Sequence, residues 1–322
     1  MGRAMMALVL AGAALALAVP AAAQDYPTKL VTLVVPFPAG GGNDALARLM
    51  AERMSRTLGQ TVVVENRGGA GGTIATRAVA KTAPDGYTIL LSYTGTFAIN
   101  PSLYANVGYD PRKDFAPIGA IAASPSVLVV HPSVPARSTA ELIAYAKANP
   151  GKLAYAYVPG TVGHITTELF GRAAGIELTK IPYKGNGDAL GNLIGGHVSM
   201  MFISILPIIG NVQAGTLRAL AVTSGECAAL LPDVPPIAES GLPGFAAVIR
   251  YGLAAPPATP RPIVERLNKE LRAALAADDV KTKLAADGAV PDPGTSDNYA
   301  AAIDADEKKW GPIVKSLNLK IE

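Results

Sequence analysis

"VVPFPAGGGNDALARLM", residues 34–50, joins an apolar strand to an amphipathic helix through a glycine-rich turn. The continuous apolar run over residues 30–35 is typical of a strand that is buried on both faces. In the helix that follows, Asn43 is the expected N-cap, and Asp44 places a negative charge in the first turn, where it is favoured. A turn of this shape presents unpaired backbone N–H groups and the partial positive charge of the helix to any anion in front of it.

This turn lacks the sequence features of a nucleotide site. Residues 38–44 have neither the Gly-Lys-Ser/Thr ending of a P-loop nor the G-x-G-x-x-G spacing that is followed about 20 residues later by an acidic side chain. Two interpretations remain, a plain tight turn or a binding site for a carboxylate. The combination of glycines with a helix N-terminus favours the carboxylate.

The rest of the chain alternates predicted strands with predicted helices. Further strands are expected at residues 61–64, 87–91, 126–132, 153–157, 198–203 and 217–224, and long helices at 262–276 and 297–315. Strands separated by helices of this length predict right-handed crossovers and parallel pairing. The expected fold class is therefore α/β, with parallel-rich sheets flanked by helices.

The N-terminus has the three-part layout of a secretory signal peptide over residues 1–23. Arg3 precedes an apolar run over residues 4–19, and small residues lead up to Ala23. The run is shorter than the roughly 20 residues that span a membrane, although an N-terminal anchor is the alternative. The residue directly after the expected cleavage point is Gln24 and not a cysteine, so lipid attachment there is not predicted. The mature protein, from Gln24, is expected to be exported to the periplasm.

Composition and motifs argue against several classes of protein. The formal net charge is only +3 and no basic stripe is present, so no nucleic-acid partner is expected. The chain has no G-x-S-x-G elbow and no H-E-x-x-H motif. His131, His164 and His197 lack metal-ligand spacing, and the single cysteine, Cys227, has no histidine near it in sequence. We therefore predict no catalytic residue, no metal and no cofactor.

Polar loops follow several of the predicted strands. They are residues 92–96, 159–164, 183–188 and 203–205, in addition to the turn at 38–44. Ligands of parallel α/β sheets bind at the carboxyl ends of the strands, so these loops are expected to meet at one crevice. Three or four charged hydrogen bonds of roughly 1.5–3 kcal/mol each would carry most of the ~8 kcal/mol of a micromolar affinity.

Seven stretches, in the same order, resemble the Bug family, the extracytoplasmic solute receptors of tripartite tricarboxylate transporters. They read YPTKLVTLVVPFPAGGGNDALAR, VVVENRGGAGGTIA, APDGYTILL, AINPSLY, PYKGNGDALGNLIGGHVSMMF, LRALAVTS and LPDVPPIAESGLPGF. The resemblance covers nearly the whole mature chain. It implies a two-domain periplasmic-binding-protein fold (Venus flytrap, type II-like), with domain 1 formed by residues 24–125 and 225–322 and domain 2 by residues 126–224.

The resemblance also implies a class of ligand and a site. Family ligands are typically carboxylates, including di- and tricarboxylic acids, aromatic acids and acidic amino acids. One carboxylate is held by the loop after the first strand, partly through backbone N–H groups and bridging water. The matching residues are Pro38, Ala39, Gly40, Gly41, Gly42, Asn43 and Asp44, then Thr94, Gly95 and Thr96, and finally Tyr183, Lys184 and Gly185. Lys184 is equally compatible with a solvated surface charge.

The chain departs from the family pattern at positions where specificity is set. The loop that contains Thr161 and His164, which are also expected at the site, is one residue shorter than usual. Ile203, followed by Ser204, stands where the family commonly has an aspartate, and this removes a partner for a ligand amine. Arg250 stands where an uncharged residue is usual. It either pairs with a distal carboxylate or forms an ion pair within the protein.

These features predict a periplasmic solute-binding protein that captures an organic carboxylate in an interdomain cleft. A dicarboxylate or an aromatic acid is favoured over an amino acid. We expect a monomer that delivers its ligand to the membrane permease subunits of a tripartite tricarboxylate transporter. The alternative is a ligand-sensing receptor that contacts the sensor kinase of a two-component system, and an enzyme is a more distant interpretation.

Overall fold

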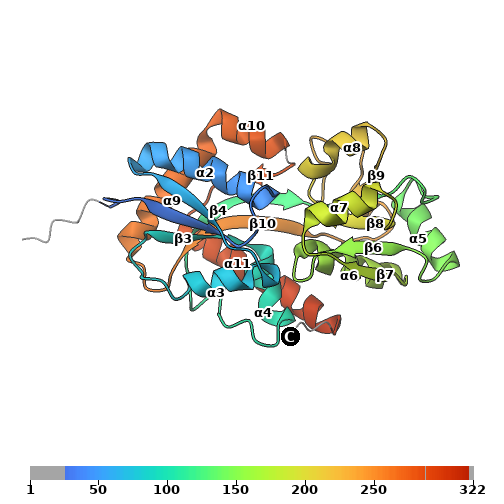
Figure 1. The fold of residues 1–322 in the computed structure, drawn as a ribbon, viewed down its shortest axis with the longest axis horizontal. Coiled ribbons are helices and arrows are strands. Elements are labelled where there is room, and N and C mark those ends of the chain that lie inside the picture. Colours follow the sequence, from blue (N-terminus) through green and yellow to red (C-terminus); the bar gives the residue numbers. More distant parts are fainter. Residues whose placement is uncertain (1–25, 287, 319–322) are drawn as a thin grey trace, which may run out of the picture.

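The computed structural model describes residues 26–286 and 288–318. They form two lobes that lie side by side, and each lobe is built around its own β-sheet (Figure 1). The predicted signal peptide, residues 1–23, lies outside the described residues.

The first lobe contains a six-stranded sheet in the order β11-β4-β10-β3-β1-β2. Its strands are β1 (Val31–Val35), β2 (Val62–Asn66), β3 (Thr88–Tyr93), β4 (Ala116–Pro125), β10 (Val248–Ala255) and β11 (Val290–Pro291). β1 pairs in parallel with β2 and β3, as the alternating sequence pattern predicts. β10 runs antiparallel to both β3 and β4, because β4 leads the chain out of this lobe and β10 brings it back.

Helices cover both faces of this sheet. They are α2 (Gly42–Leu58), α3 (Thr73–Val79), α9 (Arg261–Ala276), α10 (Asp278–Ala286) and α11 (Ser296–Ser316). Leu33 packs in the same cluster as Met50 of α2 and Leu271 of α9, whereas its neighbour Val34 packs with Ile303 of α11 on the opposite face. The apolar run at residues 30–35 is therefore continuous because β1 is buried on both faces. The predicted helices at 262–276 and 297–315 correspond to α9 and α11.

The second lobe contains a five-stranded sheet in the order β7-β6-β8-β5-β9. Its strands are β5 (Val127–Val130), β6 (Ala154–Tyr157), β7 (Thr179–Pro182), β8 (Met200–Ile203) and β9 (Arg218–Val222), and its helices are α5 (Thr139–Ala148), α6 (Val162–Ala174), α7 (Asn186–Ile194) and α8 (Ile209–Gln213). β6 pairs in parallel with β7 and β8, and β5 runs antiparallel to β8 and β9.

Short helical segments occupy several connections. They are η1 (Ala70–Gly72), η2 (Gly95–Ile99), α4 (Asn100–Leu103), η3 (Leu206–Ile208) and η4 (Ile237–Glu239). The chain passes from the first lobe to the second at Ser126, between β4 and β5, and returns after β9. One apolar cluster includes Ile99 of the first lobe together with Phe202 of the second, so the two lobes share part of their core.

Candidate functional site

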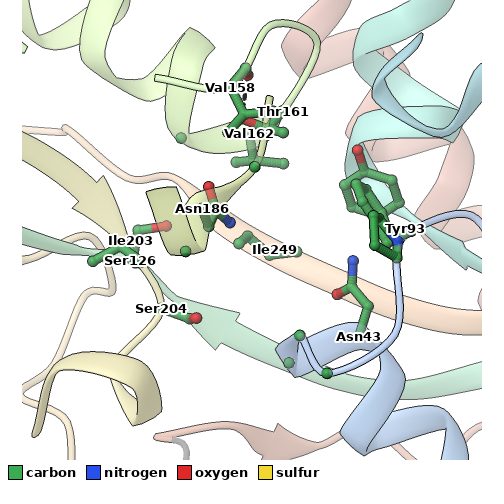
Figure 2. A pocket seen from close by; sticks show the side chains of 18 of the residues that line it. Asn43, Tyr93, Ser126, Val158, Thr161, Val162, Asn186, Ile203, Ser204 and Ile249 are labelled. Carbon is green, nitrogen blue, oxygen red and sulfur yellow. Dashed lines mark hydrogen bonds between the residues drawn. The ribbon is translucent and has the colours of Figure 1, made fainter. Parts of the chain in front are cut away.

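A cavity of about 330 Å³ lies between the two lobes and is lined by residues from both of them (Figure 2). The first lobe contributes residues 37–43, Tyr93, Ile249 and Tyr251, and the second contributes Val158, Thr161, Val162, Gly163, Lys184, Gly185, Asn186, Gly187, Phe202, Ile203 and Ser204, with Ser126 at the junction. Several of these residues follow directly after strands β1, β6, β7 and β8. The cavity thus occupies the position at which parallel α/β sheets bind their ligands.

The turn between β1 and α2 presents bare backbone to this cavity. Gly40 has a φ of 85°, and Gly41 is the N-cap of α2 in extended conformation, with no side-chain cap. Among the described residues, no acceptor pairs with the N–H groups of Gly41, Gly42 or Asn43. These donors and the positive end of a 17-residue helix are available to an anion in the cavity.

The prediction that Asn43 caps this helix is wrong. The N-cap is Gly41 and the helix begins at Gly42. The carboxylate of Asp44 reaches back and accepts a hydrogen bond from the Gly40 N–H at 2.9 Å. Asp44 does not line the cavity: its side chain is buried and pairs with Arg48, with an Nε to Oδ2 distance of 3.0 Å. The Arg48 guanidinium lowers the pKa of Asp44. Asp44 therefore shapes the turn, and its charge is neutralised locally.

Two further helices begin at the same cavity, both in the second lobe. Thr161 is the N-cap of α6, and its hydroxyl accepts a hydrogen bond from the His164 N–H at 3.4 Å. Gly185 is the N-cap of α7 and makes no side-chain cap, and the exposed Lys184 precedes it. Because helix N-termini carry partial positive charge, the cavity has positive potential contributed from both lobes.

The wall between these helix ends is aromatic and aliphatic. The Phe37 and Tyr93 rings meet edge to face at 5.2 Å, and Tyr93 stacks on Tyr251 at 6.5 Å. Ile203 and Ile249 continue this apolar surface (Figure 2). Among the described residues that line the cavity, Lys184 is the one charged side chain, and no carboxylate is present. The wall therefore suits a ligand with anionic ends and an apolar middle.

Several residues expected at the site do not line this cavity. After β3, Thr94 is the N-cap of η2, which begins at Gly95 and includes Thr96, and all three residues are buried in the protein interior. The Thr94 hydroxyl accepts a hydrogen bond from the Arg250 N–H at 2.9 Å, and Thr96 donates to the Tyr93 carbonyl at 3.2 Å. These residues support Tyr93 and β10 from behind the cavity wall.

His164, Tyr183 and Arg250 also lie off the wall. His164 is 5% exposed and stacks on the Tyr157 ring at 4.3 Å, and burial lowers its pKa to about 4. Tyr183 packs against the apolar core of the second lobe. His164 lies in the first turn of α6 on its buried side, and Tyr183 lies directly after β7, so packing within the second lobe holds both side chains.

Arg250 has partners within the first lobe. Its guanidinium forms ion pairs with Asp292 and, at 3.3 Å, with Asp306. Burial raises the pKa of Asp306, and Arg250 opposes that shift. Of the two interpretations of Arg250, the structure shows the ion pair within the protein, and a contact with a ligand is not supported by this arrangement.

Some cavity residues were not anticipated from the sequence. Asn186 and Gly187 belong to the loop 183–188 that was recognised as polar, so a signal for them was present. No sequence pattern around Ser126 or Tyr251 predicts a binding site. These residues line the cavity because the chain crosses between the lobes at β4 and β10.

The described part of the chain contains no group of three or more His, Cys, Asp or Glu side chains arranged to hold a metal ion. Nor does any helix within it combine the length and apolar character needed to cross a membrane. Cys227 is an exposed free thiol.

Comparison with known proteins identifies the family. Residues 46–319 match the model of the tripartite tricarboxylate transporter family receptor. Protein BugT of Bordetella pertussis is 37% identical over 95% of this chain and 94% of its own length. The periplasmic binding protein BugD is 38% identical, with a TM-score of 0.85 over 92% of this chain and 100% of its own.

Two solved structures of relatives were determined with acids. Rpa4515 of R. palustris with adipate is 38% identical, with a TM-score of 0.87 over 92% of this chain and 100% of its own. MatC (Rpa3494) from Rhodopseudomonas palustris with bound malate is 34% identical, with a TM-score of 0.84 over 90% of this chain and 100% of its own. These matches confirm the predicted periplasmic-binding-protein fold and the resemblance to the Bug proteins. The chain belongs to the tripartite tricarboxylate transporter receptor family, whose members are binding proteins and not enzymes.

Proposed function

We propose that this protein is a periplasmic receptor that binds an organic dicarboxylate or an aromatic acid in the cavity between its lobes. The observation that carries the proposal is the meeting of three helix N-termini, those of α2, α6 and α7, at a cavity whose described wall has no acidic side chain. Helix N-termini with free N–H groups bind carboxylates without a dedicated cation. Relatives that hold adipate and malate support this class of ligand.

In this arrangement the two ends of the ligand have different partners. One carboxylate accepts hydrogen bonds from the N–H groups of Gly41, Gly42 and Asn43 in the first lobe. The opposite end lies near the starts of α6 and α7, where Asn186 offers a polar side chain. The Thr161 hydroxyl already donates its hydrogen to the Val158 carbonyl at 2.8 Å. The methylene chain or ring between them contacts Tyr93 and the aliphatic wall, which favours apolar burial.

The same wall disfavours an amino acid. A buried ammonium group needs an acceptor of opposite charge, and an unpaired charge is costly in a cavity of low polarity. Ile203 lies on the wall at the position where a carboxylate would have met an amine. An acid without an amine is therefore expected to bind more tightly than its amino analogue.

Binding is proposed to draw together domain 1, residues 24–125 and 225–322, and domain 2, residues 126–224. The loaded form would then be delivered to the permease subunits of a tripartite tricarboxylate transporter. The family match favours this role over contact with a sensor kinase.

The test is a thermal-shift and calorimetric screen of residues 24–322 against succinate, malate, adipate, terephthalate, benzoate, aspartate and glutamate. A ligand present at 1,000 times its Kd stabilises the native state by about 4 kcal/mol. Stabilisation by a dicarboxylate or an aromatic acid would support the proposal. Tighter binding of aspartate than of succinate or malate would overturn the preference, and no response to any of these acids would contradict carboxylate capture.

A further inference from the structure

Ser126 occupies the single residue between β4, which belongs to the sheet of the first lobe, and β5, which belongs to the sheet of the second. If the angle between the lobes changes, the backbone dihedral angles must change here and in the segment where the chain returns to the first lobe. Ser126 also lines the cavity (Figure 2). This one residue is therefore part of both the junction and the candidate binding site.

The backbone of Ser126 is held in place by Thr223, which follows β9. The Ser126 N–H donates to the Thr223 hydroxyl at 2.8 Å, and the Thr223 N–H donates to the Ser126 carbonyl at 2.9 Å. The same hydroxyl donates to the carbonyl of Ala247, just before β10, at 2.5 Å, and the Ala247 N–H donates to the Thr223 carbonyl at 3.0 Å. Three segments of the junction are thus tied together through Thr223.

The side chain of Ser126 is in a different situation. It is 1% exposed, and its hydroxyl has no hydrogen-bond partner among the described residues. Buried hydroxyl groups nearly always have a hydrogen-bond partner. An unpaired hydroxyl on the wall of a cavity therefore indicates that a ligand bound in the cavity supplies the partner. Its backbone N–H and carbonyl are already used by Thr223, and only the hydroxyl is left to interact.

We propose that the Ser126 hydroxyl donates a hydrogen bond to an oxygen of the bound acid, so that the ligand contacts the junction between the lobes directly. This inference rests on the proposed function. A carboxylate offers acceptors only, and the hydroxyl can rotate its hydrogen toward one of them. Because Thr223 fixes the backbone on both sides, the hydroxyl is positioned before the ligand arrives, and little ordering is required on binding.

The test compares Ser126→Ala with Ser124→Ala, using the acid of the panel that binds the unmodified protein most tightly. Ser124 lies on β4, is equally buried and does not line the cavity. For Ser126→Ala we expect Kd to rise by about 10- to 100-fold, the loss of one hydrogen bond to a charged acceptor. The melting temperature without ligand should be unchanged or higher, because the lost hydroxyl had no partner in the protein. Ser124→Ala should bind with unchanged Kd.

Ser126→Cys provides a second variant with nearly the same size and a weaker donor. Its Kd is expected to lie between those of the unmodified protein and Ser126→Ala. If both variants bind the acid as tightly as the unmodified protein does, the role of Ser126 is refuted and carboxylate capture stands. If the unmodified protein binds no acid of the panel, the proposed function and this inference fail together.

Discussion

At the scale of single residues, the candidate site depends on backbone donors more than on side chains. Gly41 and Gly42 have no side chain that could close the turn, and Asp44 satisfies only the Gly40 N–H. The remaining N–H groups stay available because the helix starts here and has no earlier carbonyl to use them. Arg250, which the sequence suggested as a partner for a ligand carboxylate, forms ion pairs with two aspartates of the protein instead.

Gly42→Pro tests the backbone donors directly. Proline is tolerated at the first helical position, and Gly41 before it is already extended at φ −90° and ψ 172°, so α2 should form normally. The substitution removes one N–H group from the site, and Kd for the preferred acid should rise by about 10-fold or more, measured by calorimetry. Gly42→Ala retains the N–H and meets no atom within 4 Å, so its Kd should be unchanged. Equal affinity of Gly42→Pro and Gly42→Ala would rule out a contribution from this N–H group.

His164 makes stability depend on pH. Burial lowers its pKa from 6.5 to about 4, while Glu168 opposes the shift and Lys180 adds to it. Below pH 6.5 the unfolded chain therefore binds a proton at this histidine that the folded protein accepts only near pH 4. As the pH falls from 6.5 to 4, the free energy of unfolding decreases by up to roughly 3 kcal/mol.

His164→Phe retains a ring to stack on Tyr157 and cannot take up a proton. Denaturant unfolding at pH 7 and pH 4.5 should show a smaller loss of stability for this variant than for the unmodified protein. The exposed His197→Gln serves as the control and should keep the original dependence. If His164→Phe loses as much stability between pH 7 and pH 4.5 as the unmodified protein does, His164 is not the source of the pH dependence.

At the scale of elements, three helices and a pair of crossing strands place the site. α2, α6 and α7 each follow a strand that ends at the cavity, so their N-termini point toward the same space. β4 and β10 pair along most of their length and carry the chain between the lobes. Thr223 joins these crossing segments, and it is fully buried.

Thr223→Val tests this junction. Valine has nearly the same shape but no hydroxyl, so the Ser126 N–H and the Ala247 carbonyl each lose a partner. Unpaired buried groups cost about 1–3 kcal/mol each, and two of them should lower the free energy of unfolding by roughly 2–6 kcal/mol in a denaturant titration. Thr216→Val removes an exposed hydroxyl that donates to Asn211, and it should change the free energy of unfolding by about 1 kcal/mol or less. Equal stability of the two variants would mean that the junction does not depend on the hydroxyl.

At the scale of the whole molecule, the two lobes touch at the edge of the cavity. Gly160 of the second lobe lies against Gly71 and Tyr104 of the first, with φ values of 77° and 60° at the two glycines. A Cβ atom on Gly160 would lie 2.8 Å from the Tyr104 Oη and 3.3 Å from the Gly71 Cα. The lobes can approach this closely only because both positions lack a side chain.

Gly160→Ala should therefore hinder the approach of the lobes and weaken binding by about 10-fold, if ligand capture needs this arrangement. Gly215→Ala is a matched control, with a φ of 73° and no atom within 4 Å of the added Cβ. Both variants carry backbone strain of roughly 1–2 kcal/mol. Only Gly160→Ala adds a close contact between the lobes, so only this variant should show a higher Kd by calorimetry. Equal Kd values for the two variants would show that this contact is not needed for binding.

Local elements and the family could be predicted from the sequence. A continuous apolar run located β1, apolar periodicity located α9 and α11, and the glycine-rich turn indicated bare donors at the start of α2. These properties depend on neighbours within a few residues along the chain. It also identified the loops that supply Lys184, Gly185 and Ser204 to the cavity wall.

Which side chains reach the cavity could not be predicted from the sequence, because it depends on contacts between distant segments. Thr94 and Arg250, 156 positions apart, meet behind the wall, and Arg250 finds aspartates on segments that no local pattern places beside it. Ser126 and Tyr251 reach the site because the strands of two lobes cross there. Whether a polar side chain faces a cavity or the core depends on contacts between distant segments, and local periodicity carries no information about those contacts.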